Sequence, residues 1–148
     1  MDRLINRPEY LRQLIENKDV GLVKIVTGIR RCGKSSLLDL FHKYLTDNGV
    51  QEANIIHMNL ESLRYRDLTD YLSFYDYVSS RIVKNGRTYL IFDELQAVEH
   101  WEKAVESFRL DFDSDIYITG SNAYLLSAEF STLLSGRYVE IRMLPLSF

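Results

Sequence analysis

The chain has 148 residues, of which 46% are hydrophobic and 26% charged, with seven glycines and two prolines. This near-average composition excludes a disordered, collagen-like or low-complexity protein, and the length predicts one domain over residues 1–148. The 18 Lys and Arg residues against 21 Asp and Glu residues give a formal charge of -3, which argues against a surface made mainly to bind nucleic acid.

The single cysteine, Cys32, cannot form an intramolecular disulfide or a thiolate metal site. The histidines His42, His57 and His100 show no spacing typical of metal ligands. The N-terminus lacks the apolar stretch of a signal peptide, and no apolar run approaches the ~20 residues that span a bilayer. We therefore expect a cytoplasmic protein with no membrane contact.

Short β-branched or aromatic runs alternate with longer amphipathic segments, which is typical of a parallel sheet with helical crossovers. Strands are predicted at residues 22–27, 54–60, 88–93, 115–119 and 138–143. Helices are predicted at residues 8–17, 35–46, 68–83, 99–112 and 123–134. The predicted fold class is therefore α/β, with strands buried on both faces.

A phosphate-binding pattern, GxxxxGK[ST], follows the first predicted strand and precedes a predicted helix. Its glycines let the backbone wrap closely, so that N–H groups and the helix N-terminus can cradle nucleotide phosphates. Lys34 would contact the β and γ phosphates, and the Ser35 hydroxyl would bind Mg²⁺. The alternative is a strand-turn-helix junction without a ligand. The residues predicted to surround the phosphates are Gly28, Arg30, Arg31, Cys32, Gly33, Lys34, Ser35 and Ser36.

A pair of carboxylates follows the apolar run Tyr-Leu-Ile-Phe of the third predicted strand. Asp93 ends that strand, where a carboxylate can reach the Mg²⁺ shell, usually through water, as the Walker-B aspartate does. Glu94 would orient and polarise water for attack on the γ phosphate. The alternative is a pair that caps the helix after it.

Two further polar positions lie near strand ends. If the fourth strand lies between the first and the third, Ser121 or Asn122 would face the γ phosphate; the alternative is a turn that caps the next helix. Arg137 precedes the last strand, and an arginine presented there, within one chain or from a neighbouring subunit, would stabilise the charge of the transition state. A solvated surface arginine is the alternative.

Together these motifs resemble those of prokaryotic AAA-type ATPases related to the archaeal ATPase and STAND branches. The resemblance covers nearly the whole chain and rests on Gly-Ile-Arg-Arg-Cys-Gly-Lys-Ser-Ser-Leu-Leu, Tyr-Leu-Ile-Phe-Asp-Glu-Leu-Gln, Thr-Gly-Ser-Asn and Leu-Ser-Gly-Arg-Tyr-Val-Glu-Ile-Arg-Met-Leu-Pro-Leu-Ser-Phe. It implies a three-layer α/β/α P-loop NTPase with a five-stranded parallel sheet in the order 5-1-4-3-2. It also implies that Asp93 contacts the metal, that Glu94 orients water, and that Pro8 and Tyr10 lie near the adenine.

The function expected from these features is hydrolysis of Mg-ATP to ADP and phosphate, which drives a conformational change in a larger protein. The alternative is a STAND-like regulatory switch that turns over little. A GTPase is disfavoured because no Asn-Lys-x-Asp follows the phosphate loop, and a DNA-binding module lacks a basic stripe. Members of the group continue beyond the equivalent of residue 148, so we expect an ATPase core. A homo-oligomer through the ATPase face and a DNA or protein client of the following part are the expected partners.

Overall fold

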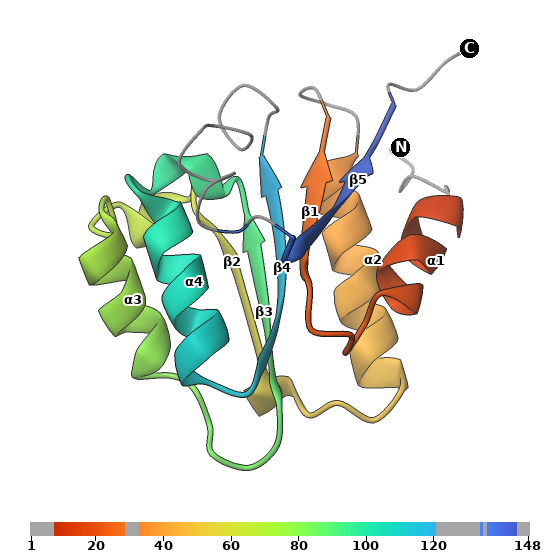
Figure 1. The fold of residues 1–148 in the computed structure, drawn as a ribbon, viewed down its shortest axis with the longest axis horizontal. Coiled ribbons are helices and arrows are strands. Elements are labelled where there is room, and N and C mark those ends of the chain that lie inside the picture. Colours follow the sequence, from red (N-terminus) through yellow and green to blue (C-terminus); the bar gives the residue numbers. More distant parts are fainter. Residues whose placement is uncertain (1–7, 29–32, 121–133, 135, 145–148) are drawn as a thin grey trace.

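The computed structural model describes residues 8–28, 33–120, 134 and 136–144 (Figure 1). Its five strands are β1 (Val23–Thr27), β2 (Ile55–Asn59), β3 (Thr88–Asp93), β4 (Ser114–Gly120) and β5 (Tyr138–Arg142). Every neighbouring pair is parallel, and the strands lie in the order β2-β3-β4-β1-β5. This is the predicted order 5-1-4-3-2 read from β2 to β5, so the sequence-based prediction is confirmed.

Helices cover both faces of the sheet and give three layers (Figure 1). They are α1 (Pro8–Glu16), α2 (Lys34–Asp47), α3 (Tyr71–Ser79) and α4 (Trp101–Asp111). One core cluster joins α1 and α2 to one face of the sheet, and a second joins α3 and α4 to the other. The four predicted helices that lie in the described residues are therefore present, within a few residues of their predicted ends.

The strands alternate between the two cores. In β3, Phe92 faces α3 and α4, where its ring centroid lies 4.9 Å from that of Phe74 and 5.9 Å from that of Phe108. Its neighbour Ile91 belongs to the cluster on the α2 side. Both faces of the strand are thus buried, as the nearly continuous apolar runs predicted, and the backbone of β3 is held between two packed layers.

Helix α3 is shorter than the predicted helix at residues 68–83. Its start is fixed by Asp70, whose carboxylate accepts a hydrogen bond of 2.9 Å from the Ser73 N–H. Its last turn closes at Ser80, whose N–H donates to the Asp76 carbonyl. The predicted helix at residues 123–134 lies outside the described residues except for Leu134.

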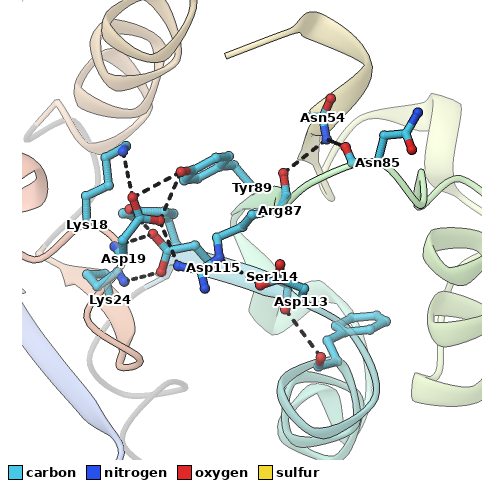
Figure 2. A network of polar contacts seen from close by, with 12 residues as sticks. Lys18, Asp19, Lys24, Asn54, Asn85, Arg87, Tyr89, Asp113, Ser114 and Asp115 are labelled. Carbon is cyan, nitrogen blue, oxygen red and sulfur yellow. Dashed lines mark hydrogen bonds and ion pairs between the residues drawn. The ribbon is translucent and has the colours of Figure 1, made fainter. Parts of the chain in front are cut away.

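A network of charged groups lies at the amino ends of the strands (Figure 2). Lys24, fully buried in β1, donates a 2.5 Å hydrogen bond to Asp115 at the start of β4. The other oxygen of Asp115 accepts bonds from the Tyr117 hydroxyl at 2.6 Å and from the Asp19 N–H at 2.9 Å. Each oxygen of the buried carboxylate therefore has a donor, and the network ties the segment before β1 to the sheet.

Candidate functional site

The phosphate loop begins where β1 ends at the carboxyl edge of the sheet. Gly28 and Gly33 both have positive φ angles, 152° and 98°, which a glycine adopts without steric strain. Gly33 is the N-cap of α2, and its carbonyl accepts a hydrogen bond of 2.9 Å from the Leu37 N–H. The loop therefore leads directly into a helix N-terminus, as the sequence pattern requires. Arg30, Arg31 and Cys32 lie outside the described residues.

Lys34 is the first residue of α2 and only 5% of it is exposed. Its ammonium donates a hydrogen bond of 2.7 Å to the Gly28 carbonyl, so the side chain reaches back across the loop to the end of β1. This places a positive charge beside the loop backbone at a helix N-terminus, an arrangement suited to a phosphate.

Ser35 and Asp93 meet although they are 58 residues apart in sequence. The Ser35 hydroxyl donates to Asp93 Oδ2 at 2.5 Å, and Asp93 is 3% exposed at the end of β3. A hydroxyl oxygen and a carboxylate oxygen at one point are the kind of ligands that Mg²⁺ prefers. The structure thus brings together the two residues predicted as metal ligands, with donor chemistry that fits the ion. Ser36 follows on α2, in its first turn.

Thr119 joins this group and was not found from the sequence. Its hydroxyl donates to Asp93 Oδ1 at 2.5 Å and accepts from the Glu94 N–H at 3.0 Å, and the residue is fully buried in β4. The sequence signal for Thr119 was a polar side chain near the end of a buried strand. In the structure Phe92 of β3 lies opposite Ile118 of β4, so the residues that follow them, Asp93 and Thr119, are neighbours. The positions favoured instead, Ser121 and Asn122, lie outside the described residues.

Glu94 has a left-handed backbone, with φ 57° and ψ 51°. It stands before a short 3-10 turn, Leu95–Ala97, but makes no side-chain capping bond to it. Its carboxylate instead accepts a hydrogen bond of 2.7 Å from Gln96 Nε2. Helix α4 begins only after His100, so in this structure neither carboxylate of the Asp93 and Glu94 pair caps it.

Arg137 lies at the amino ends of the strands, opposite the carboxyl ends where the phosphate loop begins. It is exposed and precedes β5, and its carbonyl accepts a hydrogen bond of 2.9 Å from the Val23 N–H at the start of β1. Five residue steps along β1, about 16 Å at roughly 3.3 Å per step, separate Val23 from Gly28. The structure therefore does not bring the Arg137 backbone to Gly28, the described start of the phosphate loop in its own chain.

The residues predicted near the adenine lie on α1. Pro8 opens the helix and is exposed, whereas Tyr10 is 8% exposed and packs in the core cluster of α1 and α2. The Tyr10 hydroxyl accepts a hydrogen bond of 3.1 Å from the Leu144 N–H. Tyr10 thus links α1 to the segment that leaves β5.

Two histidines form a pair that the sequence did not reveal. His42 Nδ1 on α2 and His57 Nδ1 on β2 are 2.8 Å apart, and His42 Nε2 lies 3.0 Å from a Glu52 oxygen. Burial, and next the neighbouring His42, lower the pKa of His57. Within the described part of the chain, no group of three or more His, Cys, Asp or Glu residues could hold a metal ion. No described helix is long and apolar enough to cross a membrane.

Comparison with known proteins gives a family and individual relatives. The AAA domain family matches residues 21–148. An uncharacterized protein of Haemophilus influenzae is 45% identical over 146 residues, which are 98% of this chain and 36% of that protein. The uncharacterized protein MJ1544 of Methanocaldococcus jannaschii is 35% identical over 147 residues, which are 99% of this chain and 30% of that protein. The chain thus spans about a third of the length of these relatives.

Solved structures share the fold at low sequence identity. A Walker-type ATPase of Pyrococcus abyssi has a TM-score of 0.65 at 19% identity, over 96% of this chain and 54% of that one. A DNA polymerase III gamma subunit-related protein of Thermotoga maritima has a TM-score of 0.62 at 10% identity, over 93% and 46%. AMPPCP-bound DnaA of Aquifex aeolicus has a TM-score of 0.55 at 13% identity, over 91% and 44%. The predicted P-loop NTPase fold is therefore confirmed.

Proposed function

The chain belongs to the AAA domain family, as its motifs predicted, and from this premise we propose that it binds Mg-ATP and hydrolyses it to ADP and phosphate. The observation that carries the proposal is the contact of Ser35 with Asp93 beside Lys34, which joins a phosphate loop to a buried carboxylate. One of the proteins that share the fold is described as bound to AMPPCP, an ATP analogue, which supports an adenine nucleotide as the proposed ligand.

In this proposal the loop binds the phosphates. Backbone N–H groups between Gly28 and Ser36, with the N-terminus of α2, would surround the β phosphate, and Arg30, Arg31 and Cys32 fall within this span. Lys34 leaves the Gly28 carbonyl for the β and γ oxygens. Ser35 and Asp93 would hold Mg²⁺, which would supply positive charge that neutralises the phosphates. Pro8 and Tyr10 border the adenine; because Tyr10 is buried, we assign it the role of holding α1 rather than stacking on the base.

Glu94 is the proposed base for hydrolysis. It accepts a proton from the attacking water while the water oxygen bonds to the γ phosphorus and the bond from that phosphorus to the bridging oxygen breaks. The electron pair of the broken bond stays with ADP, and the proton passes on to the released phosphate or to water. Ser121 or Asn122 senses the γ phosphate from the end of β4. Because Arg137 lies at the amino edge, we propose that it acts on the nucleotide of a neighbouring subunit.

The cycle is proposed to drive a conformational change in a longer protein in the cytoplasm. The related proteins are about three times as long as the matched segment, which supports a longer protein. A homo-oligomer through the ATPase face and a DNA or protein client of the remaining part belong to this proposal. If nucleotide binds but turnover is negligible, the alternative holds, and the chain is a regulatory switch.

The proposal predicts that Lys34→Ala weakens Mg-ATP binding by at least about tenfold, because a charge-assisted contact worth about 1.5 to 3 kcal/mol is lost. Isothermal titration calorimetry measures this. Lys43→Ala is the matched control, since Lys43 lies on the same helix, is exposed, and pairs with Asp47. Equal affinity of the Lys34 variant and the control protein would refute the phosphate-loop assignment.

It also predicts that Glu94→Gln keeps nucleotide affinity and lowers turnover by on the order of 10²-fold or more, because an amide of the same shape cannot accept the water proton. Phosphate release from saturating Mg-ATP is the assay. Glu99→Gln, an exposed change a few residues along, serves as the control. Equal turnover of wild type and the Glu94 variant would remove Glu94 from the reaction.

A further inference from the structure

Gln96 is the only residue of the 3-10 turn Leu95–Ala97 with a polar side chain, and the turn itself is firmly held. Leu95 is fully buried, Val98 is 1% exposed, and the Val98 N–H donates to the Leu95 carbonyl at 3.0 Å. The backbone that carries Gln96 is therefore anchored in the core beside the proposed nucleotide edge.

The Gln96 amide points at Glu94. Its Nε2 donates to Glu94 Oε1 at 2.7 Å, while its own Oε1 is buried with no hydrogen-bond partner among the described residues. An unpaired buried carbonyl oxygen is unfavourable, so packing alone does not explain this orientation. The reverse orientation of the amide would put two oxygens against each other. The bond to Glu94 is therefore what fixes the amide as it lies.

Glu94 is held at two points. The Glu94 N–H donates to the Thr119 hydroxyl, and this bond fixes a left-handed backbone conformation that residues other than glycine rarely adopt. The Glu94 carboxylate accepts the hydrogen bond from Gln96. A glutamate otherwise samples many rotamers. One oxygen is occupied by the amide, so the direction of the other is set, and that oxygen can receive a proton.

We propose that Gln96 is a positioning residue that aims the Glu94 carboxylate at the attacking water; this rests on the proposed hydrolysis. A neutral amide suits the task because it restricts the carboxylate without adding a full positive charge, which would reduce its affinity for a proton. Gln96 itself touches neither the nucleotide nor the water. Its contribution passes through Glu94 and belongs to turnover rather than to nucleotide affinity.

The test compares Gln96→Met, which keeps the side-chain length and removes the amide, with Gln51→Met, the same change at an exposed position ahead of β2. For Gln96→Met we expect kcat to fall on the order of tenfold, with KM and the Kd for Mg-ATP within about twofold of wild type. Gln51→Met should match wild type. Gln96→Glu should lose more than Gln96→Met at neutral pH, because two carboxylates then face each other.

A double-variant cycle separates positioning from a general structural effect. In a Glu94→Gln background, Gln96→Met should lower the residual single-turnover rate little, because there is no carboxylate left to aim. An equal fold-loss in both backgrounds, or a wild-type kcat for Gln96→Met, would overturn the inference while leaving hydrolysis intact. Wild type that binds Mg-ATP without turnover would instead overturn the proposed hydrolysis, and the role of Gln96 with it. Thermal melting of each variant checks that it is folded.

Discussion

The two edges of the same sheet use charged residues in opposite ways. At the amino edge, Lys24 and Asp115 are buried together, and the neighbouring Arg87 bonds both Asp19 and Asp113, so the charges neutralise one another within the protein (Figure 2). At the carboxyl edge, the described hydrogen bonds to the Asp93 carboxylate come from two neutral hydroxyl groups, those of Ser35 and Thr119. One edge is built on ion pairs, and the other presents a carboxylate through hydroxyl groups.

This difference shows which charges hold the fold and which are available to a ligand. A hydroxyl donor satisfies a carboxylate without cancelling its charge, and it can rotate to accept or release a hydrogen bond. A buried ion pair has no such freedom, because removing either charge leaves the other desolvated. We therefore expect substitutions in the buried Lys24 and Asp115 pair to change stability alone and substitutions around Asp93 to change activity more than stability.

The largest effect should come from Asp115→Ala at the amino edge. This substitution leaves the buried Lys24 without its carboxylate partner. Burial lowers the pKa of Lys24, whereas Asp115 acts to raise that pKa. The loss should be about 3 to 5 kcal/mol of unfolding free energy, the usual result of breaking a buried pair, measured by urea denaturation. Nucleotide affinity of the remaining folded protein should be unchanged.

Two variants control this measurement. Asp113→Ala removes an exposed carboxylate that pairs with Arg87, and exposed pairs contribute about 1 kcal/mol or less. A double variant, Lys24→Met with Asp115→Leu, should regain most of the lost stability because no charge stays buried. If the Asp115→Ala and Asp113→Ala proteins had equal free energies of unfolding, the buried pair of Lys24 and Asp115 would not contribute to stability.

Thr119→Val should give a smaller and different effect at the carboxyl edge. It removes the hydroxyl that bonds Asp93 and the Glu94 N–H, at a cost of about 1 to 3 kcal/mol for the buried groups left unpaired. Turnover should fall further than this loss of stability explains, because Glu94 loses its backbone anchor. Thr119→Ser keeps the hydroxyl and should retain both properties. Reduced stability with a wild-type kcat would mean that Thr119 only supports the fold.

The fold could be predicted from the sequence because it depends on repeated signals. Buried strands such as 88–93 are nearly continuous apolar runs, and the glycine pattern before Lys34 marks the junction of a strand with a helix. Helix ends were less certain, because the start of α3 depends on a single capping bond from Asp70 to Ser73.

The site could be predicted only where a motif carries it. The contact of Ser35 with Asp93 could be expected because each stands at a fixed place in a pattern. Thr119 was missed because its role depends on which residue of β4 lies beside Asp93, and that is a property of strand register. The partners of Lys24 and His57 were missed for a related reason, since contacts between distant segments leave no local pattern.

The smallest effect should come from His57, which lies between the two edges in the middle of β2. Burial and the facing His42 lower its pKa, with Asp39, Asp93 and Glu52 acting in the other direction. The unfolded chain therefore binds a proton more readily than the folded protein, and stability should decrease as the pH falls below about 6.5 toward the folded pKa, then level off.

Urea denaturation of wild type and His57→Gln at a series of pH values tests this. The variant should lose part of the decrease seen below pH ~6.5, because the substituted position no longer takes up a proton on unfolding. His100→Gln, at an exposed position, should keep the wild-type slope. The change should be smaller than that of Asp115→Ala, since His57 is neutral at higher pH and only its protonation is opposed. An identical pH dependence in wild type and His57→Gln would show that the histidine pair does not contribute to the dependence of stability on pH.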